Sequence, residues 1–161
     1  MENFKSYESL LIEDDRWQYF CQFETAPIRV PITLQYIYDN IATINLSDHV
    51  PDEIKGQFNI AKMLAVYSWL YDPFHQASEL KAYSTLEYAL RQKYKVRGLN
   101  NLLKRSVEDG IVKRIDYPEL LSYMRNDLAH GSTTLHPDSD RTLRTCTNII
   151  NELFRPKDIN I

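Results

Sequence analysis

The sequence predicts an all-α fold: an antiparallel four- to five-helix bundle over residues 51–161, preceded by an N-terminal extension over residues 1–50. The chain has 161 residues, of which 43% are hydrophobic, and this is enough for one core. It has only four glycines and seven prolines, too few for the many turns of a β-sandwich or barrel. Apolar residues also recur at three- and four-residue steps along much of the chain.

The first two helices of the bundle are predicted over residues 52–71 and 73–94. The stripe of the first helix consists of Ile54, Phe58, Ala61, Leu64, Ala65 and Ser68. The stripe of the second consists of Leu80, Tyr83, Leu86 and Leu90. Such spacing places these side chains on one face of each helix, where a core can cover them. Asp72-Pro73 separates the two helices, and Gly98 is expected to mark the end of the second.

Three further helices are predicted over residues 99–110, 118–131 and 138–154. Pro118 is suited to a first helical position, whereas Gly110 and Gly131 are suited to the left-handed caps that follow helices. The apolar residues of these helices are Leu99, Leu102, Leu103 and Val107, then Leu120, Leu121, Met124 and Leu128, then Leu143, Cys146, Ile149, Ile150 and Leu153.

Residues 1–50 carry a less regular pattern. Leu34, Ile37, Ile41 and Ile44 have the spacing of a short helix, and residues 28–30 are a candidate extended segment. An aromatic cluster precedes them, formed by Trp17, Tyr19, Phe20 and Phe23. These aromatic side chains are expected to pack on the bundle, and the alternative is that they bind a protein partner.

Several function classes are disfavoured by what the sequence lacks. No basic segment followed by an apolar run begins the chain, and no stretch reaches the roughly 18 apolar residues of a membrane span. Cys21 and Cys146 lie far apart, outside any metal-ligand spacing. We therefore expect a cytoplasmic protein with reduced thiols, no metal, no cofactor and no membrane partner.

Charge is unevenly distributed along the chain, although the net charge is only −3. Residues 1–55 carry ten acidic and four basic residues, whereas residues 81–125 carry ten basic and five acidic residues. The basic residues that form a candidate RNA-binding surface are Lys93, Lys95, Arg97, Lys104 and Arg105, with Lys113 and Arg114. A solvated helix face is the alternative interpretation of the same residues.

The most informative segment is Arg125-Asn126-Asp127-Leu128-Ala129-His130-Gly131, at the predicted end of a helix. Arg125 borders the apolar stripe, where a guanidinium requires an anionic partner. Asn126 and Asp127 precede His130 by four and three residues, so either side chain can reach the imidazole from the preceding turn. The helix dipole also stabilises a charged histidine in the last turn. These features are equally compatible with an ordinary helix C-terminus.

This segment resembles the R-x4–6-H motif of the HEPN superfamily, with Arg125, the polar residue Asn126 and His130 in the motif positions. The wider stretch 120–131 is similar to the motif helix of that family, and 79–90 is similar to an earlier core helix. The resemblance covers residues 52–154. It implies a small helical bundle. At 100° per residue, Arg125 and His130 lie about 140° apart around one helix, which predicts a homodimer in which Arg125 of one chain approaches His130 of the other.

Many HEPN proteins are metal-independent endoribonucleases of toxin–antitoxin and antiphage defence systems. By resemblance, His130 would be the general base on a ribose 2′-hydroxyl, Arg125 would hold the scissile phosphate, and Asn126 would orient His130 or hydrogen-bond the phosphate. Asp127 would contact these side chains rather than the RNA itself. RNA is then the expected substrate, and an antitoxin or regulatory protein is a further candidate partner.

Two alternatives stay open at this stage. Some HEPN proteins are noncatalytic dimers that bind proteins or nucleotides. In one toxin branch, a nucleotidyltransferase partner modifies a tyrosine two residues after the histidine. This chain has Ser132 at that position, so regulation by that modification is not expected. Four other polar residues are candidates for the site, but we interpret them as structural or surface residues: Glu87, His49, His75 and His136.

Overall fold

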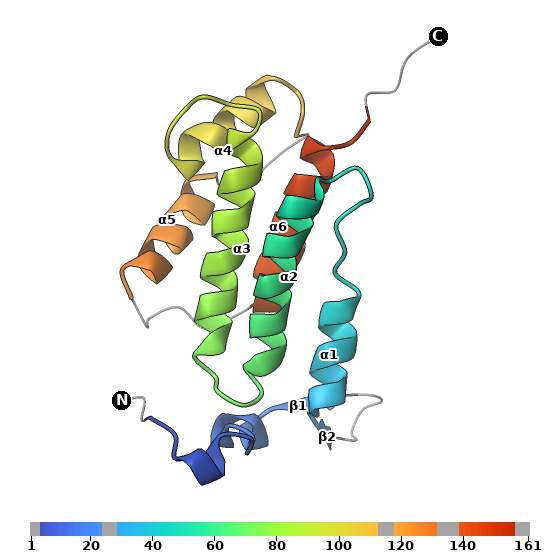
Figure 1. Ribbon diagram of the computed structural model, residues 1–161, viewed down its shortest axis with the longest axis vertical. Helices are drawn as coiled ribbons and strands as arrows, with labels where there is room; N and C mark the ends of the chain where they lie inside the picture. Colours follow the sequence, from blue (N-terminus) through green and yellow to red (C-terminus); the bar gives the residue numbers. More distant parts are fainter. Residues whose placement is uncertain (1–3, 24–28, 113–117, 132–138, 157–161) are drawn as a thin grey trace.

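The computed structural model describes residues 4–23, 29–112, 118–131 and 139–156. Within these ranges the chain forms six α-helices and a two-stranded antiparallel sheet (Figure 1). The helices are α1 (Leu34–Ala42), α2 (Asp52–Tyr67), α3 (Phe74–Arg91), α4 (Leu99–Glu108), α5 (Pro118–Ala129) and α6 (Ser139–Leu153). The strands β1 (Cys21–Phe23) and β2 (Arg29–Pro31) follow two 3-10 turns, η1 (Tyr7–Ser9) and η2 (Asp15–Tyr19). The all-α prediction is confirmed.

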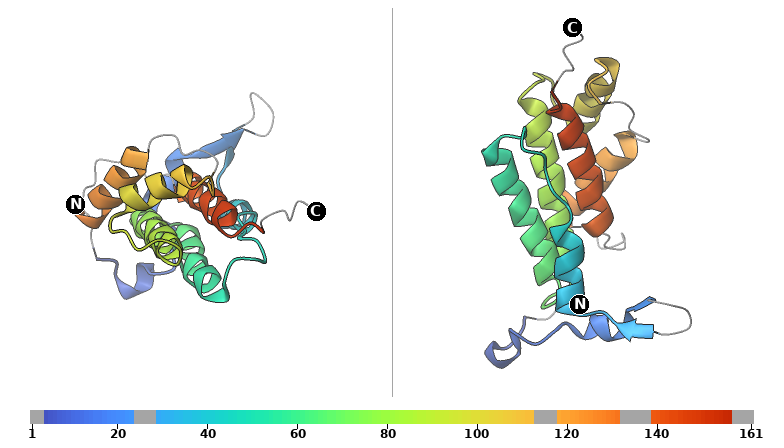
Figure 2. Two further views of the ribbon diagram at one scale, coloured as in Figure 1. Left: turned by 90° about the horizontal axis from the view of Figure 1, so that it is seen from above. Right: turned by 90° about the vertical axis from the view of Figure 1, so that its right-hand side faces the viewer.

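Helix α3 lies at the centre of the bundle. It packs against α2 and α6, which run alongside it, and against α4 and α5 on its other side (Figures 1 and 2). Its apolar residues Tyr83, Leu86 and Leu90 are buried as predicted, but so are the polar residues Ser78 and Thr85. A helix is buried on more than one side when neighbours cover it from several directions, and this is the position of α3.

The predicted apolar stripes of α2 and α6 also face the core. Ile54, Phe58 and Ala61 of α2 are almost completely buried, and so are Leu143 and Cys146 of α6. These residues belong to one continuous cluster of buried side chains. One core therefore accounts for the described bundle, as the length of the chain predicted.

Glycines mark two of the helix ends where the sequence predicted them. Gly110 and Gly131 have φ angles of +67° and +77°, the left-handed conformation that favours glycine after a helix. The prediction for Gly98 was wrong in detail. Helix α3 ends at Arg91, several residues earlier, and Gly98 with a φ of +83° is the residue before α4.

The N-terminal extension is joined to the bundle by apolar and polar contacts. Ile37, Ile41, Ile44 and Val50 are buried in the same core as α2 and α3. The segment before α1 lies across one end of the bundle (Figure 2). The extended conformation considered for residues 28–30 is present at residues 29 and 30, which belong to β2.

Asp14 is the main polar anchor of this segment. Its side chain is buried, and its carboxylate accepts hydrogen bonds from the side chain and backbone N–H of Arg16 and from the backbone N–H of Asp72. Arg16 also bonds to the Asp72 carboxylate at 2.9 Å. Burial alone would raise the pKa of Asp14, but the hydrogen bonds from Arg16 and Asp72 outweigh it and lower the pKa below its ordinary value of 3.8.

We expect Asp14→Asn to lower the free energy of unfolding at neutral pH by about 1–3 kcal/mol, because a hydrogen-bonded charge is lost. A lowered pKa in the folded state stabilises the fold above the ordinary value of 3.8, and this contribution is lost as the pH falls through the folded-state pKa. Urea unfolding should therefore show the two proteins converging in acid. Asp15→Asn, at an exposed neighbour, is the matched control. A pH-independent difference would contradict this account.

Within the described part of the chain, no helix is both long and apolar enough to cross a membrane. Both cysteines are free, and complete burial raises the pKa of the Cys146 thiol, which makes it a poor nucleophile. No group of three or more potential metal-ligating side chains was found among the described residues.

Candidate functional site

The candidate site lies at the C-terminal end of α5. Leu128 is buried, and Leu121 and Met124 are half-buried against the core, so one face of α5 is fixed on α3 and α4. The backbone N–H of His130 donates to the Asn126 carbonyl at 3.0 Å and continues the helical pattern by one residue. Gly131 then turns the chain out of the helix.

Arg125 lies at the edge of this apolar face, and its guanidinium is directed at α3. Its Nη2 donates to Oε2 of Glu87 at 3.0 Å, and its Nη1 donates to Oδ1 of Asn126 at 3.1 Å. The Arg125 side chain is only 33% exposed, and its Nε is buried without a hydrogen-bond partner among the described residues. The anionic partner that the sequence analysis required for Arg125 is therefore Glu87.

Glu87 is shared between two arginines. Its side chain is 10% exposed, and its Oε1 accepts from Nη2 of Arg91 at 2.6 Å while Oε2 accepts from Arg125. The cluster of Glu87, Arg91 and Arg125 thus has one more positive than negative charge. An anion that approaches Arg125 meets a net positive group whose geometry is held by hydrogen bonds from two helices.

The sequence alone predicts a structural or surface role for Glu87. The four-residue step from Glu87 to Arg91 was a visible signal of a pair on one helix. The contact with Arg125 spans 38 positions of sequence and depends on how α3 packs against α5.

His130 is exposed just beyond the end of α5. Its imidazole makes no hydrogen bond with the residues that the structure describes. The Asn126 oxygen accepts from Arg125, and Oδ2 of Asp127 is buried with no partner in the described ranges. Orientation of the His130 ring by Asn126 or Asp127 therefore stays a prediction.

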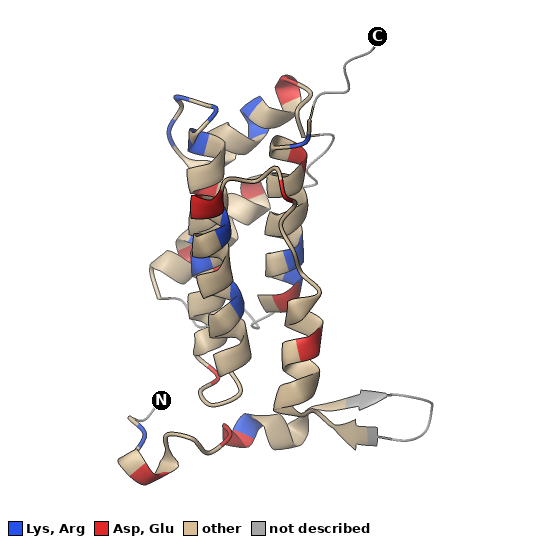
Figure 3. Ribbon diagram, turned by 45° about the vertical axis from the view of Figure 1, so that its right-hand side comes forward, with Lys and Arg blue, Asp and Glu red and all other residues tan. Residues whose placement is uncertain are grey.

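The candidate RNA-binding residues lie toward the other end of α5. Glu119, near the start of α5, pairs with Lys104 of α4 at 2.7 Å. At 1.5 Å per residue, this contact is roughly 16 Å along the helix from His130. Figure 3 shows the basic segments after α3 and on α4 at one end of the bundle. The fold therefore does not bring this group directly beside the motif.

The basic residues also differ in what they contact. Lys93 donates to the Leu153 carbonyl and lies over the Phe154 ring, 5.1 Å from its centre. Arg105 pairs with Glu108 and Asp109 on its own side of α4. Lys95 and Arg97 are exposed in the loop between α3 and α4, and neither has an ion pair with a described residue.

Of the other histidines, His49 is exposed and His75 donates to or accepts from Ser139 in a cavity at the far side of α3. Neither lies in the motif. Lys113, Arg114, Ser132 and His136 lie outside the described residues.

Comparison of the chain with family models, curated proteins and solved structures gives no match. The similarity to HEPN proteins therefore consists of the motif and the pattern of the helices that carry it, and membership of that family is an expectation.

Proposed function

We propose that this chain is a metal-independent endoribonuclease of the HEPN type that acts in the cytoplasm. The observation that carries the proposal is the placement of Arg125. Its guanidinium is held between Glu87 and Asn126 at the end of the helix that leads to His130, which is exposed. A held cation and an accessible imidazole are the two groups that RNA transesterification requires from a protein.

In the proposed reaction, His130 removes the proton from a ribose 2′-hydroxyl, and the 2′-oxygen attacks the adjacent phosphorus. Arg125 stabilises the additional negative charge of the phosphorane. The bond from phosphorus to the 5′-oxygen then breaks, and this oxygen takes up a proton from water or from the protonated His130, which returns to its neutral form. The products are a 2′,3′-cyclic phosphate and a 5′-hydroxyl. The oxidation state of the phosphorus does not change.

A homodimer is part of the proposal because of the geometry of α5. At 100° per residue, Leu120, Tyr123 and His130 lie on one face of the helix, whereas Arg125 lies on the opposite side. Leu120 and Tyr123 are 50% and 61% exposed, so this face carries uncovered apolar surface. Because Arg125 and His130 lie about 140° apart around the helix, one helix cannot easily direct both at a single phosphate. We therefore propose that the α5 helices of two subunits meet near a twofold axis toward their C-terminal ends, where part of this apolar surface is covered and each site takes Arg125 from one subunit and His130 from the other.

Lys95 and Arg97 are the residues that we propose to guide the RNA backbone. Both are exposed, and neither cationic group is neutralised by a described acidic residue. Lys93, Lys104 and Arg105 contribute less in this proposal, because their head groups already contact protein oxygens. Contacts of Lys95 and Arg97 with RNA phosphates would make the affinity for RNA fall as the salt concentration rises.

The test is cleavage of a labelled single-stranded or loop-containing RNA by the purified chain in excess EDTA. We expect cleavage to persist, since neither group in the mechanism is a metal, and the upstream products to carry 2′,3′-cyclic phosphates. These ends block ligation until acid or a cyclic phosphodiesterase opens the ring and a phosphatase removes the resulting phosphate. Cleavage that requires Mg²⁺, or products that end in a free 3′-hydroxyl, would contradict the proposal.

A noncatalytic interaction module is the second candidate, and the N-terminal arm favours it. Phe4, Tyr7, Leu11 and Tyr19, which lie within 16 residues of one another in the N-terminal extension, are each at least 80% exposed. A chain that fails to cleave RNA, and whose self-association is lost on Tyr19→Ser and Leu11→Ser, would support this candidate instead. In this second candidate function, the N-terminal extension would bind an antitoxin or a regulatory protein.

A further inference from the structure

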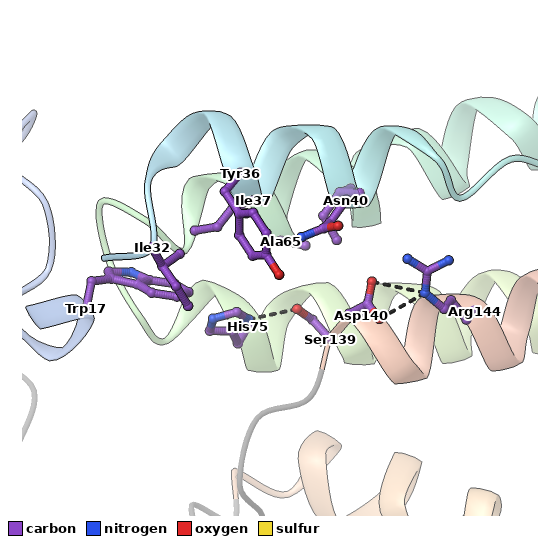
Figure 4. Close-up of a pocket in the computed structure, with 11 residues that line it drawn as sticks. Trp17, Ile32, Tyr36, Ile37, Asn40, Ala65, His75, Ser139, Asp140 and Arg144 are labelled. Carbon is purple, nitrogen blue, oxygen red and sulfur yellow. Dashed lines mark hydrogen bonds and ion pairs between the residues drawn. The ribbon is translucent and has the colours of Figure 1, made fainter. Parts of the chain in front are cut away.

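A cavity lies between α1 and α6, on the side of the bundle away from α5. Its volume is about 360 Å³, at the small end of the range for ligand sites. Figure 4 shows its walls, with Trp17 and Ile32 at one end and Asp140 and Arg144 at the other. The cavity is thus apolar at one end and polar at the other.

The apolar end is rigidly built. The Trp17 ring packs against Trp69 and His75, with centroid distances of 5.6 Å and 5.7 Å. Its indole N–H donates to the Ser68 carbonyl at 3.1 Å. The ring is therefore held in place by its contacts with Ser68, Trp69 and His75, and it lines the apolar end of the cavity.

Two polar pairs in the cavity are already satisfied. His75 Nδ1 and Ser139 Oγ are hydrogen-bonded at 2.7 Å, which links α3 to the start of α6. Both carboxylate oxygens of Asp140 accept from Nε of Arg144, at 2.9 Å and 3.2 Å. Asp140 is the one acidic residue that lines the cavity in the described part of the chain, and its charge is thereby compensated.

Three hydrogen-bond donors in the cavity are not satisfied in this way. The outer nitrogens of Arg144 make only a 3.4 Å contact with the Thr43 hydroxyl. The Tyr36 hydroxyl and the Asn40 amide have no hydrogen-bond partner among the described residues, and both point into the space between α1 and α6 (Figure 4). The open positions thus offer donors, one of them charged, to a bound group.

We propose that this cavity binds a small amphipathic monocarboxylate. The apolar body lies against Trp17, Ile32 and Ile37, and the carboxylate accepts from the outer edge of Arg144 and from Asn40. A guanidinium bonded to Asp140 through Nε keeps its opposite edge for a second carboxylate, and a charge-assisted bond is stronger than a neutral one. This inference does not depend on the proposed ribonuclease activity.

Intrinsic fluorescence provides the test, because the chain has two tryptophans: Trp17 lines the cavity, and Trp69 packs against Trp17. The probes are 3-phenylpropionate and its neutral counterpart 3-phenylpropan-1-ol, titrated into the full chain at constant ionic strength and neutral pH. We expect the acid to bind with a Kd below about 1 mM, and about tenfold more tightly than the alcohol.

Arg144→Gln should remove this preference for the acid, and Arg155→Gln should keep it. Arg155 is likewise a partly exposed arginine of the same region that pairs with an acidic residue, Glu152 at 3.7 Å, but it does not line the cavity. Equal binding of acid and alcohol by the wild-type chain would overturn the proposal. So would unchanged acid binding by Arg144→Gln, or no fluorescence change with either probe up to about 10 mM.

Discussion

Arg125→Ala and His130→Ala should each reduce RNA cleavage in EDTA by at least about 100-fold. His130 is the proposed base, and loss of a general base of this kind slows proton transfer by about 10²–10⁴-fold. Arg125 is the proposed stabiliser of the phosphorane charge, which no other described residue of the motif can replace. Single-turnover cleavage rates at saturating protein measure both losses separately from RNA binding.

Neither variant should unfold the protein. His130 is exposed, and Arg125→Ala leaves Glu87 with its second partner, Arg91. His49→Ala and Arg155→Ala are the matched controls, because they remove the same side-chain types from exposed positions outside the motif and outside the candidate RNA-binding residues. Cleavage that survives both motif substitutions would show that the activity, or a contaminating nuclease, does not use this site.

A mixture of Arg125→Ala and His130→Ala chains should recover about one quarter of the wild-type activity per chain. If subunits exchange freely, half of the dimers are hybrids, and each hybrid has one intact site of two. In that site, Arg125 comes from one chain and His130 from the other. The recovered fraction distinguishes a composite site from one that each chain completes alone.

This experiment needs independent proof that hybrids form, and differently tagged chains captured through one tag provide it. Hybrids that form yet stay inactive would exclude the composite site while leaving a ribonuclease site within one chain. Wild-type cleavage by a protein that sediments as a monomer would do the same. Tyr123→Ser, on the exposed face of α5, should lower both dimerisation and activity, since it removes apolar surface from the proposed interface.

Local patterns in the sequence were sufficient for the helices. The stripes of Phe58 on α2, Leu86 on α3 and Leu143 on α6 are buried as their spacing required. The helix ends followed from Gly110 and Gly131, whose lack of a Cβ permits the positive φ of a cap. Each of these features depends on residues within about one or two turns of one another, so one sequence contains the necessary information.

The candidate site was only partly predictable in this way. Arg125, Asn126 and His130 lie within six residues, and the sequence alone placed them at a helix end. The sequence analysis also required an anion for Arg125, from the position of that residue beside an apolar stripe. It did not identify Glu87, because several acidic residues satisfy that requirement until the packing of α3 against α5 is known.

By itself, the sequence determined the all-α class, the helical segments and the position of the motif, because these depend on short-range periodicity and capping. Only the tertiary structure decided which distant groups meet. It paired Glu87 with Arg125, anchored Arg16 on Asp72 across 56 positions, and placed His75 against Ser139 across 64 positions. Such contacts follow from the way whole helices pack, and packing is set by the combined shape of the core rather than by any local pattern.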